Sequence, residues 1–315
     1  MGISAAVITF LYHRQQELPK MSRQSLFSIL LILVLALGLA ACGPSTQPAD
    51  NNRLLVVASI LPLADFAQQV GGDRVRVEAL VPPGASPHTY ELIPAQLQAV
   101  SRARVLVLNG VGLEYWAEEV ISAADNPDLT VVTTADGLEI IGGDEHESGG
   151  NPHVWLSPRN AIHQVEKISD ALIQADPAGA DTYRANADQY VGELQALDQE
   201  IREAVAGFSC RQFIAFHAAW AYFARDYGLE QAAVVERTPG AEPSPAEIAE
   251  IVKTARAIGA KAIFAEPQFS SKAAEVIAEE SGAQVLFLNP LGQPPHYGYL
   301  ELMRYNLNEI GKALK

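Results

Sequence analysis

Short runs of β-branched and aliphatic residues alternate with segments of helical periodicity, and this alternation is the strongest constraint on the fold. The runs predict strands at 54–60, 75–81, 105–109 and 129–134, and again at 211–216, 231–236, 261–265 and 284–288. Helices are expected at 62–71, 94–103, 113–124 and 157–175, and at 217–227, 244–258, 270–281 and 297–314. Such alternation is typical of parallel sheets covered by helices. We therefore expect an α/β protein with two lobes, each a four-stranded, mostly parallel sheet flanked by helices.

One segment, residues 178–206, interrupts this alternation because it contains no strand pattern. Its apolar residues recur at spacings of three and four, the stripe of one long helix. The stripe comprises Tyr183, Ala187, Tyr190, Leu194, Leu197, Ile201 and Val205. We expect a rigid helix at 178–206 that joins an N-terminal lobe at 53–177 to a C-terminal lobe at 207–315. Gly192 is a weak point within that helix.

The N-terminal segment has the pattern of a bacterial lipoprotein signal peptide. Basic residues precede an apolar run from Leu26 to Ala41 that is short for a membrane span, and the run ends at Cys42. We expect residues 1–41 to be removed, Cys42 to carry lipid and residues 42–52 to form a flexible tether. The alternative is a signal anchor with an incidental cysteine. The expected location is extracytoplasmic, at the membrane surface.

Charge and cysteine content exclude two kinds of protein. The formal net charge is -15, which argues against a nucleic-acid partner, since nucleic acid requires a basic face. The chain has only two cysteines, so lipidation of Cys42 leaves Cys210 without an intramolecular partner. A Cys-rich structural zinc site is therefore not expected, and Cys210 is interpreted as a small residue of the core.

Three histidines follow predicted strands. His88 comes after the second strand, His153 after the fourth and His217 at the end of the fifth. Because ligands of open α/β sheets bind beyond the carboxyl ends of the strands, these side chains are expected to meet in the cleft between the lobes. Neutral imidazole is a good ligand for zinc and related ions. For any one of them alone, a structural loop role is the simpler interpretation.

Six segments carry a resemblance to a known family. PPGASPHTYEL, NPHVWLSPRNA and FIAFHAAWAYFARDYGL contain the three histidines, and EPSPAEIAEIVK, AIFAEPQFSSKAAEVIAEESGAQVLFLNPLG and YLELMRYNLNEI lie in the second half. Together they resemble the metal-binding receptors of bacterial zinc and manganese ABC importers, the cluster A-I family. The resemblance covers nearly the whole chain after the signal segment.

The resemblance implies that two lobes joined by one long helix hold a divalent metal in the cleft, with His88, His153 and His217 as ligands. The transported ion is expected to be Zn²⁺, with Mn²⁺ as the alternative. The expected partners are an ABC importer permease and its ATPase, together with the membrane through the lipid anchor. We expect a monomer without catalytic activity.

The fourth ligand departs from the family pattern. Relatives often have an acidic residue in a stretch resembling Leu-Asp-Pro-Leu-Gly, and here the matching residue is Asn289, a neutral amide. Asn289 is a doubtful ligand, and water, Glu266 or His296 are the alternatives. For Glu266, a structural carboxylate that satisfies loop amides is slightly favoured.

A short acidic loop precedes the second histidine, as in zinc-specific relatives that carry a His-rich insert. Asp144, Glu145, His146 and Glu147 could collect metal transiently, and a solvated Gly-rich loop is an equally good interpretation.

Two other functions remain open at this point. A secreted zinc-dependent hydrolase would use three ligands and an open position for water, but the HExxH, GxSxG and P-loop motifs do not occur. An adhesin-type lipoprotein with a role in cell adhesion is the other alternative. The sequence offers neither the repeats nor the aromatic surface expected of one.

Overall fold

The computed structural model describes residues 53–142, 149–238 and 240–315, which belong to one compact unit. The unit contains two parallel sheets, one from each half of the chain. None of the helices in these residues is both long and apolar enough to span a membrane.

The N-terminal lobe is built on a four-stranded sheet in the order β2-β1-β3-β4, in which every pair is parallel. Its strands are β1 (Leu54–Ala58), β2 (Val75–Ala79), β3 (Val105–Leu108) and β4 (Thr130–Thr133). Its helices are α3 (Leu61–Gly71), α4 (Pro94–Arg102), α5 (Ala117–Ala124) and α6 (Pro158–Ala175).

The C-terminal lobe repeats this topology with the order β6-β5-β7-β8, again all parallel. Its strands are β5 (Gln212–Ala215), β6 (Glu230–Val234), β7 (Ala262–Ala265) and β8 (Gln284–Phe287). Its helices are α8 (Ala221–Tyr227), α9 (Pro245–Ile258), α10 (Lys272–Ser281) and α11 (Tyr299–Leu314). The predicted fold class is confirmed.

Each sheet is covered on both faces, because apolar side chains along its strands point alternately to one face and to the other. In β1, Val56 and Ala58 point to one face, and Leu55 and Val57 point to the other. The second face is covered by α4 and α5 in the N-terminal lobe and by α9 and α10 in the C-terminal lobe. Each lobe therefore has a hydrophobic cluster of its own.

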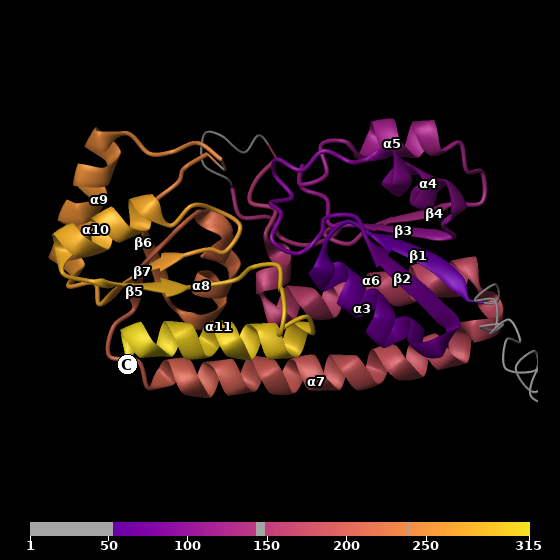
Figure 1. Cartoon of the computed structure of the whole chain (residues 1–315). Helices are drawn as coiled ribbons and strands as arrows, with labels where there is room; N and C mark the ends of the chain where they lie inside the picture. The colour runs from indigo at the N-terminus through magenta and orange to yellow at the C-terminus, as the bar shows by residue number, and fades with distance from the viewer. Residues whose placement is uncertain (1–52, 143–148, 239) are drawn as a thin grey trace, which may run out of the picture. The chain divides into compact units, whose positions relative to one another are not determined.

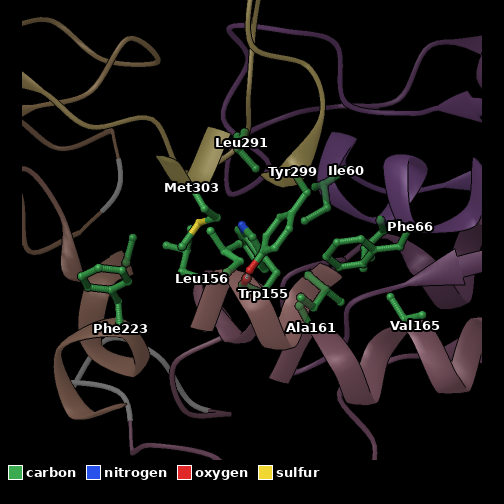
Figure 2. Close-up of a cluster of buried hydrophobic side chains, with 14 of the residues drawn as sticks. Ile60, Phe66, Trp155, Leu156, Ala161, Val165, Phe223, Leu291, Tyr299 and Met303 are labelled. Carbon is green, nitrogen blue, oxygen red and sulfur yellow. Dashed lines mark hydrogen bonds between the residues drawn. The ribbon is translucent and has the colours of Figure 1, made fainter. Parts of the chain in front are cut away.

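The first face of each sheet belongs to one continuous core that both lobes share. The long helix α7 (Ala180–Ala206) runs beneath both lobes beside α11 (Figure 1). All seven residues of its predicted stripe are buried, and all belong to this core. Figure 2 shows the centre of the core, where Trp155 and Tyr299 lie next to each other. The two lobes are thus packed against each other as well as joined by α7.

Two predicted helices begin four residues later than the sequence suggested. The helix expected at 113 begins at Ala117, because Gly110, Val111 and Gly112 all have positive φ and form a turn instead. The helix expected at 217 is preceded by a 3₁₀ turn at Ala218–Trp220, which leaves His217 in extended backbone before it. Both departures lie at the carboxyl end of a strand, where the chain turns.

Two substitutions in α7 should change stability in opposite directions. Leu194→Ala should lower the free energy of unfolding by about 2–5 kcal/mol, because it leaves a cavity in the shared core. Gly192→Ala should raise it by up to about 1 kcal/mol, because Gly192 is exposed and no atom lies near an added Cβ. Chemical denaturation followed by circular dichroism measures both. Destabilisation by Gly192→Ala would contradict the packing described for α7.

Candidate metal centre

The three predicted histidines lie at the carboxyl ends of strands in both lobes. His88 lies in the loop after β2, and His153 lies after β4, before the 3₁₀ turn Val154–Leu156. His217 lies two residues after β5. Parallel strands present their carboxyl ends at one edge of a sheet, so the topology places all three on the cleft side of their lobes.

The structure brings the three imidazoles together. The Nε2 atom of His153 lies 3.0 Å from that of His88 and 3.0 Å from that of His217. One ligand atom from each histidine lies within 4.8 Å of the other two. His153 and His217 are buried, with 1% and 4% of their surface exposed, and His88 is half-buried. His88 and His153 are 65 residues apart in the sequence, and His153 and His217 are 64 apart, yet the three side chains converge on one point.

Asn151 fixes the ring of His153. Its Oδ1 accepts hydrogen bonds from the backbone N–H of His153 at 3.0 Å and from Nδ1 of the ring at 2.8 Å. Its Nδ2 donates to the carbonyl of Ala218, next to His217, at 2.6 Å. An amide oxygen only accepts, so the ring proton of His153 lies on Nδ1 and Nε2 carries the lone pair. Asn151 also links the loops of the two lobes that carry His153 and His217.

Glu266 fixes the ring of His217 in the same way. Its Oε1 lies 2.8 Å from Nδ1 of His217, and only 1% of Glu266 is exposed. The carboxylate therefore accepts the Nδ1 proton and leaves the Nε2 lone pair directed at His153. A carboxylate behind a ligating histidine is a common support in metal sites. The partner of Glu266 is thus the ring of His217, whereas the sequence favoured loop amides as its partners.

Burial keeps the imidazoles of His88 and His153 neutral. Burial and, to a smaller extent, the nearby His217 lower the pKa of His88 to about 3. Burial also holds the pKa of His153 well below its ordinary value, with smaller contributions from His217 and His88. The lone pair on Nε2 of His153 therefore lies 3.0 Å from Nε2 of His217. A cation between these nitrogens would accept electron density from both rings.

The candidates for a fourth ligand lie in different surroundings. Asn289 is buried, and its Oδ1 accepts hydrogen bonds from the N–H groups of Leu291 and Gly292 and from the side chain of Gln268. His296 stacks on Tyr305 and does not line the histidine cavity. Glu266 lines that cavity. Asn289 thus holds the turn of its own loop.

The cavity also contains residues that sequence reasoning did not single out. Ser86, Trp155, Gln268 and Phe269 line it together with the three histidines. Trp155 and Asn151 each lie two residues from His153, so their proximity to a candidate ligand was a signal that the sequence offered. Nothing comparable pointed to Gln268, because its position depends on the fold of the C-terminal lobe.

Two sequence predictions lie outside the described residues. They are the lipid attachment site Cys42 and the metal-collecting loop residues Asp144, Glu145, His146 and Glu147.

The residues that flank this loop are held together beside the metal centre. Asn151 donates its N–H to the carbonyl of Ile141 at 2.8 Å. The hydroxyl of Tyr222 accepts from the N–H of Ile141 and donates to the carbonyl of Asn151. Ile141 and Asn151, on either side of residues 143–148, are therefore held together two residues before His153.

Comparison with known proteins identifies relatives of this fold and site. Residues 56–313 match the family described as zinc-uptake complex component A, periplasmic. The zinc-binding lipoprotein AdcA of Streptococcus pneumoniae serotype 4 is 33% identical over 91% of this chain. The manganese-binding lipoprotein MntA of Halalkalibacterium halodurans is 30% identical over 90% of this chain and 97% of its own length. A crystal structure of ZnuA, 36% identical, has a TM-score of 0.77 and covers 83% of this chain and 99% of its own.

The match to AdcA covers only 60% of the length of that relative. The family match, in contrast, runs from β1 to α11 and includes all three histidines of the cavity. With a family match over most of its length, the chain belongs to the family of periplasmic A components of zinc-uptake complexes.

Proposed function

We propose that this chain is an extracytoplasmic receptor that captures a divalent transition metal and delivers it to an ABC importer. The observation that carries the proposal is the convergence of three imidazole nitrogens in one cavity between the lobes. His88, His153 and His217 are the proposed ligands. The relatives named for binding zinc and manganese support a metal as the cargo.

Zinc is the proposed cargo, and manganese is the second candidate. The group of converging ligand atoms contains three nitrogens and no carboxylate oxygen. Zinc accepts histidine nitrogen readily, whereas manganese is a harder ion that prefers carboxylate oxygen and stands lowest in the Irving–Williams order. The donor atoms therefore favour zinc.

The remaining parts of the proposal concern the partners and the membrane. We propose delivery to a permease and its ATPase by a monomeric receptor that is tethered through lipid on Cys42. The family relationship and the names of relatives as lipoproteins support these assignments.

The geometry at Glu266 argues for metal binding and against hydrolysis. Its Oε1 accepts a hydrogen bond from Nδ1 of His217, on the side of the ring away from Nε2. This oxygen is therefore not placed to act as a base on a water bound to a metal at Nε2.

Replacing His153 should abolish tight zinc binding. His153 is in contact with both other histidines, and loss of a supporting side chain alone typically weakens metal affinity by about 10–100-fold. His153→Ala should therefore lower zinc affinity by more than about 100-fold, measured by competition with a chromophoric chelator. His163→Ala and His296→Ala are matched controls outside the cavity and should keep wild-type affinity. Wild-type affinity in His153→Ala would refute the site.

Zinc binding at pH 6 should release few protons. A histidine with an ordinary pKa of 6.5 is about three-quarters protonated at pH 6. The lowered pKa values of His88 and His153 leave both neutral there, so neither has a proton to lose. Calorimetric titration in two buffers of different ionisation enthalpy measures the number released. We expect the release of less than about one proton per zinc ion bound. Ordinary pKa values for His88 and His153 would instead give a release of about 1.5 protons or more.

Cys42 should carry the lipid anchor, because the apolar run of the signal segment ends there. Cells fed a labelled fatty acid should label the wild-type protein and not Cys42→Ser. Cys210→Ser is the matched control and should retain the label. Equal labelling of the wild type and Cys42→Ser would refute lipidation at Cys42.

A further inference from the structure

Within the described part of the chain, three polar atoms of residues that line the histidine cavity are buried without a hydrogen-bond partner. They are Oγ of Ser86, Oε2 of Glu266 and Oε1 of Gln268, and all three residues line the cavity that contains the Nε2 atoms. A buried polar atom without a partner is costly, so such atoms in a binding cavity indicate where a ligand interacts. The three atoms differ in how they are oriented.

The orientation of Gln268 is fixed by Asn289. Oδ1 of Asn289 accepts from the N–H of Leu291 at 3.0 Å and from the N–H of Gly292 at 2.9 Å, so this atom must be an oxygen. The group that Gln268 presents to it at 3.1 Å must therefore be the donor Nε2. The other end of the amide, Oε1, is consequently directed away from Asn289 and remains unpartnered.

Glu266 is oriented differently. Its carboxylate is bonded to Nδ1 of His217, and the two nitrogens of an imidazole point to opposite sides of the ring. A metal ion bound at Nε2 therefore lies across the ring from this carboxylate. Glu266 supports His217, and its place in the site does not provide a fourth ligand.

We propose that Oε1 of Gln268 is the neutral oxygen ligand that completes the three-histidine site. The proposal rests on the receptor function proposed above. The C-terminal lobe would then contribute Nε2 of His217 and this amide oxygen, and the N-terminal lobe would contribute two histidines. Asn289, at the position where relatives carry a carboxylate, would act by orienting Gln268. A neutral oxygen at the fourth position leaves the site without a ligand charge, which disfavours manganese relative to zinc.

The test compares metal binding in five variants of the mature chain, one of which is Asn289→Asp. Gln268→Met removes the oxygen and keeps the length of the side chain, and Gln268→Glu replaces the oxygen with a carboxylate. Gln98→Glu adds the same charge at an exposed position on α4 and serves as a control. Ser86→Ala removes the unpartnered oxygen that the N-terminal lobe contributes to the cavity. Zinc and manganese affinities are measured by competition titration, and the visible spectrum of the Co²⁺-loaded protein reports the ligand set.

Gln268→Met should weaken zinc binding at least about tenfold and alter the Co²⁺ spectrum, while the thermal unfolding of the metal-free protein stays unchanged. Gln268→Glu should narrow the gap between zinc and manganese affinity, and Gln98→Glu should leave that gap at its wild-type value. Asn289→Asp should change the gap less than Gln268→Glu, because its oxygen is held by two backbone N–H groups.

The proposal is overturned if Gln268→Met retains the wild-type zinc affinity and Co²⁺ spectrum. It is also overturned if Ser86→Ala or Asn289→Asp alters the spectrum while Gln268→Met does not. Failure of the wild-type protein to bind zinc or manganese would refute the receptor function itself, so the two failures can be told apart.

Discussion

The packing of Trp155 between the lobes is the interaction on which the metal centre depends. The indole N–H donates to the carbonyl of Pro290 at 2.7 Å, and the hydroxyl of Tyr299 donates to the carbonyl of Trp155 at 2.7 Å. Both rings are fully buried in the core that the lobes share (Figure 2). Trp155 also lines the histidine cavity, two residues after His153. The contact between the lobes therefore also forms one wall of the site.

Further contacts across the same interface reinforce this arrangement. Asp65 on α3 accepts from the N–H of Tyr299 on α11 at 2.9 Å and from the hydroxyl of Tyr190 on α7 at 3.0 Å. Ser157 donates to Asp226 on α8. Close packing makes a core resist changes of volume, so an interface continuous with the core restricts movement of one lobe against the other. The separation of His153 and His217 is set by this packing.

The site combines costly features that a bound cation would offset. Nε2 of His153 lies 3.0 Å from Nε2 of His217, and burial keeps His153 neutral by lowering its pKa. Asn151 and Glu266 hold the rings in the tautomer that exposes Nε2. Supporting hydrogen bonds of this kind reduce the reorganisation needed on binding. The metal-free fold is therefore organised for a cation of borderline softness before one arrives.

The sequence by itself determined the elements, because alternating β-branched runs and an apolar stripe with helical spacing are local patterns. It also identified His88, His153 and His217, since each follows a predicted strand and parallel strands align their carboxyl ends. The supporting residues were beyond its reach. Glu266 reaches Nδ1 of His217 because β7 lies next to β5, and Gln268 is turned by an amide 21 residues later. Only the tertiary structure decided which polar groups support a ligand and which lie away from the cavity, because hydrogen-bond partners depend on which loops the packing of the sheets brings together.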